Sequence, residues 1–329
     1  MSGAIQLRVW KIISLLFFGC ACAFLGYQFK STENTSSKAI RENTSQYKFI
    51  SPLLAVSRPD PSVPTGGYDR LSKEVASYIS DRKKTGLIDS ASVYLINYTQ
   101  SGSFAINEDE GYNPASLMKV VIMMTYFKQA ENTPRLLEST LLYSPALDQA
   151  LKATPYDTQS VLVPNKSYSV QTLIDKMIID SDNGAMNLLL AAMSDAHMQE
   201  TYTALGIRGP QAGTPYTISA KDYSFFFRVL YNATYLSRDY SEKALSILSQ
   251  ARYKDGLVAG LSQSTIVAHK FGEHVNAVAG QVDTFELHDC GIVYQNDDTF
   301  LLCVMTKGKQ LTDLSDTIAI ITKMVSKGR

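Results

Sequence analysis

The stretch YNPASLMKVV, Tyr112–Val121, places a lysine in a run whose other members are almost all apolar. If residues 117–127 (LMKVVIMMTYF) form a helix, that helix is hydrophobic on nearly every side, and such helices are usually buried. Desolvation lowers the pKa of a buried lysine and allows it to act as a general base. Ser116 lies one turn before Lys119 on the same helical face. The pair therefore predicts a serine nucleophile beside its base.

The spacing alone leaves an alternative open. Ser116 would then simply cap the helix N-terminus, while Lys119 extends its ammonium group to water. The pattern S-x-x-K also recurs at Ser45–Lys48 and Ser80–Lys83, although both of these pairs lie in polar surroundings. The decision between catalysis and capping depends on the rest of the chain.

Composition excludes some classes of function. The chain has 329 residues, which can bury a sizeable core, and its 31 basic residues balance 31 acidic ones. This balance gives no nucleic-acid signature. The four histidines show no metal-ligand spacing. The sequence therefore predicts no nucleic-acid partner, no metal and no organic cofactor, and it does not specify an oligomeric state.

The N-terminus contains an apolar run at residues 12–29, IISLLFFGCACAFLGYQF, which is just long enough to span a bilayer. Arg8 and Lys11 precede this run and favour a cytoplasmic location for residues 1–11. Everything after Lys30 is then expected outside the cytoplasm. The prediction is a plasma-membrane protein with one transmembrane anchor.

Two alternatives to an uncleaved anchor remain. Ala21-Cys22-Ala23 resembles the small-residue cleavage site of a signal peptide, and Gly19-Cys20 resembles a lipoprotein site. Cleavage would yield a secreted or lipid-anchored protein. All three interpretations export the globular part.

Residues 30–67 are rich in Ser, Thr, Asn and Pro and show no sustained apolar period, which predicts an extracytoplasmic linker. A single catalytic domain is expected at 68–329. Its predicted elements are a helix at 68–84, strands at 91–98 and 103–107, a mostly helical stretch at 117–252, strands at 265–272, 277–295 and 299–308, and a helix at about 311–326. This order predicts an α+β fold, in which an antiparallel sheet of N- and C-terminal strands is flanked by helices and an all-helical region is inserted.

Local signals add two expectations. Ser219 and Asp222 resemble a capping box at the start of a helix. Cys290 and Cys303 flank the turn QNDD, so a two-residue loop would place them opposite each other, and export permits a disulfide there. Two buried thiols are favoured over a disulfide, because a slip of one residue in the strand register would separate the pair.

Two further motifs follow Ser116 in chain order. Ser181-Asp182-Asn183 is the only S-D-N sequence, and Lys270-Phe271-Gly272 lies in a predicted strand. A literal K-T-G occurs at Lys84-Thr85-Gly86, but it precedes Ser116 and lies in a predicted loop, so it lacks the order and the context that the motif needs. S-x-x-K, S-D-N and K-[ST]-G in this order are the signature of class A β-lactamases and penicillin-binding proteins.

The chain resembles that superfamily over most of residues 68–329, and the class A β-lactamases most closely. The segments SVQTLIDKMIIDSDNGAMNLLL and CGIVYQNDDTFLLCVMTKG are similar to the corresponding segments of those enzymes. The resemblance implies a serine nucleophile that forms an acyl-enzyme with an amide carbonyl.

The resemblance also implies a role for each residue of the motifs. Ser116 is the expected nucleophile and Lys119 its base, while Ser181 relays a proton to the leaving nitrogen. Lys270 supplies positive charge for the substrate carboxylate and for Ser181.

Substrate binding is expected from Asn183, which would bond the side-chain amide of the substrate, and from the strand at Gly272 and Glu273. The backbone N–H groups of Ser116 and Glu273 are the expected oxyanion hole.

Two departures from the family pattern limit the functional prediction. The stretch Leu205–Ser224 has no glutamate where class A β-lactamases carry the one that activates the deacylating water, and Asp222 lies within a predicted helix. Phe271 replaces the hydroxyl residue that would bond the substrate carboxylate.

The leading hypothesis is an exported serine hydrolase that is acylated by β-lactams or D-Ala-D-Ala-like amides and deacylates slowly. The alternatives are a D,D-peptidase of cell-wall peptides and a non-catalytic module that binds β-lactams or peptidoglycan.

Overall fold

The computed structural model describes residues 47–51, 68–100, 102–147, 162–277, 283–295 and 298–328. The apolar run at 12–29, where an anchor is expected, lies outside these described residues. Among the residues that are described, no helix is long and apolar enough to cross a membrane.

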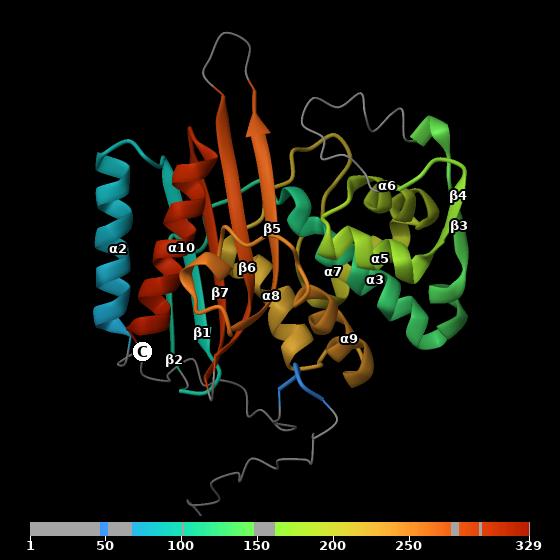
Figure 1. Cartoon of the computed structure of the whole chain (residues 1–329), viewed down its shortest axis with the longest axis horizontal. Coiled ribbons are helices and arrows are strands. Elements are labelled where there is room, and N and C mark those ends of the chain that lie inside the picture. Colours follow the sequence, from blue (N-terminus) through green and yellow to red (C-terminus); the bar gives the residue numbers. More distant parts are fainter. Residues whose placement is uncertain are drawn as a thin grey trace, which may run out of the picture. The chain divides into compact units, whose positions relative to one another are not determined.

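A five-stranded antiparallel sheet in the order β2-β1-β7-β6-β5 forms the centre of the domain (Figure 1). Its strands are β1 (Ser90–Asn97), β2 (Gly102–Ile106), β5 (Ile266–Asn276), β6 (Thr284–Gln295) and β7 (Asp298–Gly308). Because β1 pairs with β7, the first hairpin of the domain joins the last three strands. The predicted fold, with strands from both ends of the domain in one antiparallel sheet, is therefore confirmed.

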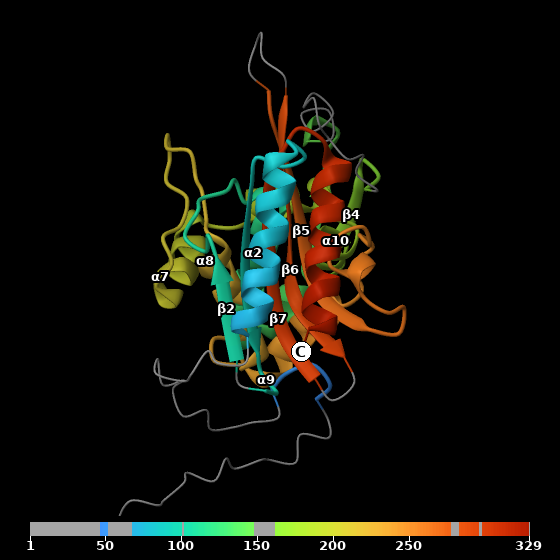
Figure 2. The same ribbon diagram turned by 90° about the vertical axis from the view of Figure 1, so that its left-hand side faces the viewer.

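Two helices cover one face of this sheet, namely α2 (Asp69–Lys84) and α10 (Leu311–Lys327), and they lie side by side in Figures 1 and 2. Leu71, Val75 and Ile79 recur every four residues along α2 and are buried. This spacing places them on one helical face, which packs on the sheet through a core shared with Val93 and Ile318. The helices at the two ends of the domain were thus predictable from their apolar period.

The inserted region lies on the opposite side of the sheet. Its elements are η1 (Ala115–Leu117), α3 (Met118–Asn132), η2 (Pro134–Glu138), β3 (Thr140–Tyr143), β4 (Lys166–Ser169), α5 (Val170–Ile179), α6 (Asn183–Ala192), α7 (Asp195–Leu205), α8 (Ala220–Tyr231), α9 (Arg238–Leu248) and η3 (Val258–Gly260). Ser219 caps α8 by accepting a hydrogen bond from the Asp222 N–H at 3.1 Å, as its sequence context predicts.

One correction concerns this region, which is not entirely helical. Strands β3 and β4 pair as a separate two-stranded sheet. Each has four residues and most of their side chains are not buried, so no alternation of apolar residues marks them.

The cysteine prediction was wrong. Cys290 and Cys303 lie opposite each other in the register of β6 and β7 and are joined by a disulfide. Gln295 pairs with Asp298, so a two-residue connection fixes the register that the sequence left open. Both cysteines are fully buried in the core.

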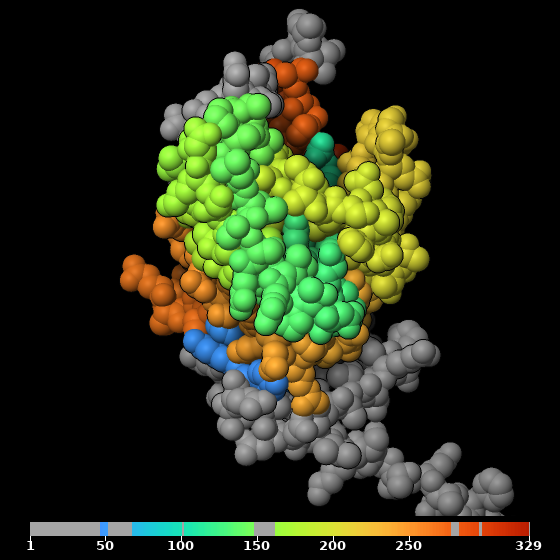
Figure 3. All heavy atoms as spheres, turned by 90° about the vertical axis from the view of Figure 1, so that its right-hand side faces the viewer, coloured from blue at the N-terminus to red at the C-terminus, as the bar shows by residue number. Residues whose placement is uncertain are grey.

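The linker interpretation does not hold for Tyr47–Ser51. The Glu242 carboxylate of α9 accepts hydrogen bonds from the backbone N–H groups of Lys48, Phe49 and Ile50 at 2.6, 2.8 and 3.0 Å. Phe49 and Ile50 are buried in the larger core cluster. Figure 3 shows this segment in blue against the orange α9. The five residues are therefore part of the folded domain.

We expect Glu242→Ala to lower the free energy of unfolding by about 2 kcal/mol, because three backbone donors lose a charged acceptor. Protease cleavage beside Tyr47–Ser51 should accelerate in parallel. Urea unfolding and limited proteolysis measure the two effects. Glu74→Ala is the matched control, since Glu74 makes an exposed contact with Arg70 on one helix. Equal changes in unfolding free energy and cleavage rate for the two substitutions would show that the Glu242 contacts do not stabilise the docked segment Tyr47–Ser51.

Candidate active site

The predicted nucleophile, Ser116, lies in η1 at the point where the chain enters α3. Its side chain is half-buried, and its hydroxyl makes no hydrogen bond to another of the described residues. Ala115, directly before it, has a φ of +46°, in the left-handed region that non-glycine residues rarely adopt. Such a conformation costs of order 1–3 kcal/mol and persists only where surrounding contacts impose it.

Lys119 is fully buried, as its apolar neighbours predict, which contradicts the alternative of a side chain that extends to water. Its Nζ donates to the Ser181 carbonyl oxygen at 2.6 Å, to Asn183 Oδ1 at 2.7 Å and to Ser181 Oγ at 3.1 Å. The methylene groups of Lys119 therefore have apolar surroundings, whereas its amino group donates hydrogen bonds to three oxygens. The sequence predicted the burial and did not predict these acceptors.

Ser181 lies between α5 and α6, with a φ of +56°. Asp182 caps α6, since its carboxylate accepts the Ala185 N–H at 2.8 Å. The Ser181 hydroxyl contacts both lysines of the motifs, because Lys270 Nζ also donates to it at 3.0 Å. The S-D-N sequence thus does two things: its aspartate starts a helix, and its serine joins α3 to β5.

Lys270 lies on β5 and is almost fully buried. Burial and the charge of Lys119 hold the pKa of Lys270 well below its ordinary value, and Asp289 opposes this shift. Besides Ser181, the Lys270 ammonium group donates to the Phe271 carbonyl oxygen at 2.9 Å. It also lies 4.1 Å from the centroid of the Phe271 ring, which is a cation–π distance.

Phe271 therefore does more than remove a hydroxyl from the motif. Its ring stacks on Tyr253 with centroids 4.0 Å apart and 17° between the planes. His269, which flanks it in sequence, is buried and bonds the Asp289 carboxylate at 2.8 Å. Leu257 N–H donates to the other oxygen of Asp289 at 2.9 Å, which secures the loop that carries Tyr253. No sequence signal marks Tyr253, which lies 18 positions before Phe271.

Gly272 allows β5 to contact η1 directly. A Cβ atom at this position would lie 2.8 Å from the Pro114 carbonyl oxygen and 3.2 Å from the Leu117 backbone nitrogen. Only glycine accommodates that approach without a shift of one backbone. Tyr223 holds the other side of η1, where its hydroxyl donates to the Leu117 carbonyl oxygen at 3.0 Å.

The structure thus brings Lys119, Ser181, Asn183 and Lys270 into one hydrogen-bonded cluster. Ser116 and Glu273 lie on the two elements that meet at Gly272, but neither side chain is bonded to the cluster among the described residues. Lys84-Thr85-Gly86 ends α2 on the far face of the sheet, so it takes no part in the site. Groups of acidic, histidine or cysteine side chains that could hold a metal ion are absent from the described part of the chain.

The sequence model described as "Beta-lactamase enzyme family" matches residues 70–328. Comparison with curated protein sequences found no match. Among solved structures, PBP-A has 21% sequence identity and a TM-score of 0.65, with 78% of this chain and 94% of PBP-A covered. The class A beta-lactamase from Mycobacterium abscessus has 19% identity and a TM-score of 0.64, with 78% and 98% covered. A beta-lactamase from Chitinophaga pinensis has 16% identity and a TM-score of 0.65, with 77% and 98% covered. At these identities the structures show a shared fold.

The lowered pKa of Lys270 predicts a stability cost that depends on pH. Lys270→Met should raise the free energy of unfolding at about pH 7 by about 1–3 kcal/mol, because methionine buries no charge. The stability advantage of Lys270→Met should shrink with rising pH. Between the lowered pKa of Lys270 in the folded protein and its ordinary pKa of 10.5, the lysine is protonated in the unfolded chain and neutral in the folded one. In that window the wild type gains stability as pH rises. Urea unfolding from about pH 7 to about pH 10 measures the difference, and a constant difference would refute the assignment.

Proposed function

The chain belongs to the beta-lactamase enzyme family, and from that premise we propose that Ser116 forms an acyl-enzyme with β-lactams or with D-Ala-D-Ala-like amides of cell-wall peptides. Family membership makes the chain a serine hydrolase of amide bonds. The proposal adds the substrates, the role of each residue and a slow release of the acyl group. The observation that carries it is the Ser181 hydroxyl, which lies 3.1 Å from Lys119 Nζ and 3.0 Å from Lys270 Nζ.

In the proposed acylation, Ser116 Oγ attacks the amide carbonyl carbon and Lys119 takes the hydroxyl proton. Lys119 must be neutral for this step, so the proton that it directs at Ser181 Oγ in the free site is released before acylation begins. The C–N bond then breaks, and the Ser181 hydroxyl gives its proton to the leaving nitrogen. Lys119 returns its extra proton to Ser181 through their 3.1 Å contact. Lys270, which donates to Ser181 Oγ at 3.0 Å, stabilises the oxygen of Ser181 during this transfer.

The contact between β5 and η1 supports the proposed oxyanion hole. Two backbone N–H groups, those of Ser116 and Glu273, would stabilise the negative oxygen of the tetrahedral intermediate. They lie on the two elements that Gly272 brings into backbone contact. Asn183 would orient the side-chain amide of the substrate, while its Oδ1 stays bonded to Lys119.

Deacylation is proposed to be slow because the expected position offers no carboxylate. The stretch 205–219 contains neither aspartate nor glutamate, and Asp222 is exposed in the first turn of α8. A D,D-peptidase, which passes its acyl group to an amine or to another water, is the second candidate favoured by the same observation. A variant of PBP-A forms an acyl-enzyme with penicillin G, and the adduct proposed here at Ser116 is of that kind.

The domain is proposed to act outside the cytoplasm, either held by an anchor at 12–29 or secreted after cleavage. The buried Cys290–Cys303 disulfide supports this location, since disulfides persist in oxidising compartments. Recovery of the full chain in the cytosolic fraction of its own cells would exclude the proposed export.

Ser116→Ala and Lys119→Ala should each abolish covalent labelling by a fluorescent penicillin, because one removes the nucleophile and the other its base. Denaturing gels of the labelled proteins measure the effect. The double variant should label no less than either single variant, since the pair acts as a unit. Ser80→Ala, in the exposed S-x-x-K of α2, is the matched control and should label normally. Label that persists in Ser116→Ala and disappears in Ser80→Ala would reverse the assignment.

A chromogenic β-lactam should give a burst of about one equivalent followed by slow turnover in a stopped-flow assay. General-base assistance is worth about 10²–10⁴-fold, so deacylation should lag behind acylation by a factor of that order. Fast steady-state hydrolysis without a burst would mean that another group activates the water.

Phe271→Thr should speed acylation by carboxylate-bearing β-lactams, because it restores a hydroxyl donor and frees the Lys270 ammonium group from the aromatic ring. The slow phase should not change, since Phe271 has no role in activating water. Failure of both the wild type and Phe271→Thr to acylate would favour the non-catalytic binding module.

A further inference from the structure

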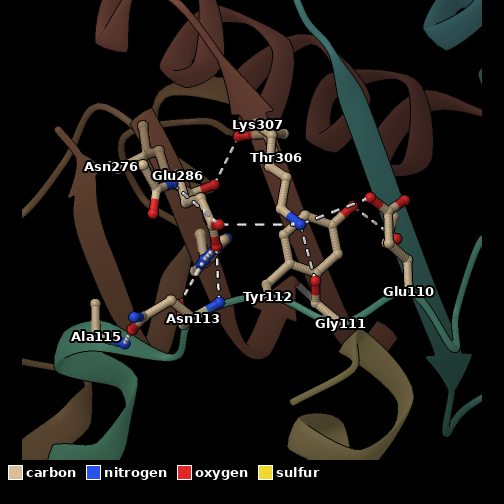
Figure 4. A network of polar contacts seen from close by, with 12 residues as sticks. Glu110, Gly111, Tyr112, Asn113, Ala115, Asn276, Glu286, Thr306 and Lys307 are labelled. Atoms are coloured by element: carbon tan, nitrogen blue, oxygen red, sulfur yellow. Dashed lines mark hydrogen bonds and ion pairs between the residues drawn. The ribbon is translucent and has the colours of Figure 1, made fainter. Parts of the chain in front are cut away.

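A row of polar side chains on the sheet holds the segment that precedes the nucleophile (Figure 4). Glu286 and His288 alternate on β6 and therefore point to the same face, and Lys307 of β7 pairs with Glu286 in the register. The same face carries Lys270, whose register partner on β6 is Cys290. Glu286, His288 and Lys307 take no part in the proposed acylation, although they lie directly beneath residues 111–115.

The backbone of this segment is bonded residue by residue. Lys307 Nζ donates to the Gly111 carbonyl oxygen at 2.9 Å. Tyr112 exchanges two backbone hydrogen bonds with Ile218 at 3.0 and 2.9 Å. The N–H of Asn113 donates to Glu286 Oε2 at 2.7 Å, and its carbonyl oxygen lies 3.0 Å from His288 Nε2. Both peptide groups that flank the Asn113 Cα are thus held by two side chains of one strand.

The partner of His288 fixes where its proton lies. A carbonyl oxygen only accepts, so Nε2 must carry the proton that bonds Asn113. His288 Nδ1 is buried without a partner among the described residues, where an unpaired N–H would be costly. The histidine therefore acts as a donor from Nε2, directed at one carbonyl group.

Asn113 links the two side chains of β6 to Ala115, the strained residue directly before Ser116. Asn113 Oδ1 accepts the Ala115 N–H at 3.0 Å, and Figure 4 shows the two residues at the start of η1. Ala115 has a φ of +46°. A left-handed alanine needs contacts that over-determine it, and the bond from Asn113 is one of them. The path therefore runs from β6 through Asn113 and Ala115 to Ser116.

We infer that Glu286 and His288 are positioning residues for the nucleophile, which clamp the N–H and the carbonyl group of Asn113 and so impose the backbone of Ala115 that directs Ser116 at the substrate. The inference rests on the proposed function. Neither residue touches the reacting atoms in the proposed acylation. Their contribution is to hold Ser116 within the small displacement that acyl transfer tolerates.

The charges around Glu286 support an ionised clamp. Burial raises the pKa of Glu286, but His288, the Asn113 N–H and Lys307 together outweigh burial and hold the pKa below its ordinary value. Lys307 lies 3.9 Å from Glu286 and from Glu110. Asn276 of β5 donates to the remaining oxygen of Glu286 at 3.3 Å. A carboxylate that accepts an N–H is a stronger partner than a neutral group.

The test compares truncating with conservative substitutions in the full chain. Glu286→Ala and His288→Leu remove the two bonds to Asn113, whereas Glu286→Gln keeps an acceptor and His288→Gln keeps a donor. Stopped-flow measurement with a chromogenic β-lactam gives the acylation rate constant at saturation and the half-saturating concentration. Thr306→Val is the control, because it removes a buried hydroxyl bonded to the Leu287 carbonyl group on the opposite face of the sheet.

The truncating variants should lose about 10- to 100-fold in the acylation rate constant, with the half-saturating concentration within about twofold of wild type. The two glutamine variants should recover most of the loss. Thr306→Val should unfold at a lower urea concentration and acylate normally. Unchanged acylation in a folded truncating variant would overturn the inference, as would glutamine variants that lose as much as the truncating ones.

A second measurement separates this inference from the proposed function. If the wild type is not acylated by any β-lactam, the proposed function fails and the rate comparison has no content. Hydrogen exchange of the Asn113 and Ala115 amides is independent of activity. In Glu286→Ala these amides should exchange at least about tenfold faster relative to amides of α10, since the acceptor of Asn113 is lost. Equal exchange in the two proteins would overturn the clamp.

Discussion

Two buried lysines, Lys119 and Lys270, meet at one hydroxyl group, that of Ser181. Each buried charge costs several kcal/mol unless polar partners surround it. The partners come from α3, from the loop before α6 and from β5, so these elements must pack together for either lysine to be tolerated. The mutual repulsion of the lysines also lowers the pKa of Lys270. The cluster is thus a site of stored unfavourable energy, which the apolar cores on both sides of the sheet must offset.

The second constraint is the contact between β5 and η1. Gly272 permits this contact, and the left-handed Ala115 lies within it. The segment around the contact is held by Tyr223 and by the row of Glu286, His288 and Lys307. The sheet therefore serves two functions. Its outer face packs on the terminal helices, and its inner face carries the polar groups that hold both the nucleophile segment and the lysine cluster.

Much of this architecture could be predicted from the sequence, because it depends on local patterns. The all-round apolar character of 117–127 predicted the burial of Lys119. The family resemblance carried by the three motifs predicted that Lys119, Ser181 and Lys270 meet, whereas the hydroxyl of Ser116 makes no hydrogen bond to them. Helix starts such as Ser219 follow from side-chain chemistry within a few residues. The burial of Lys119 and the helix starts require no knowledge of which distant segments come into contact.

The features that could not be predicted depend on distant contacts. From the sequence, Phe271 is only a lost hydroxyl, whereas the structure places both Tyr253 and Lys270 against its ring. The docking of Tyr47–Ser51 depends on Glu242, about 190 positions later. Positive φ at Ala115 and Ser181 has no sequence signal, since neither residue favours that conformation. The disulfide needed a register that the turn residues alone did not fix.

The proposed role of the lysine cluster is to make Ser116 a nucleophile. Its most direct test is mass spectrometry of the full chain, quenched in acid seconds after mixing with an excess of penicillin G. If Ser116 is the nucleophile, nearly every molecule gains the mass of one intact β-lactam, and peptide mapping locates it on Ser116. An unmodified protein, or an adduct located on another residue, would contradict it.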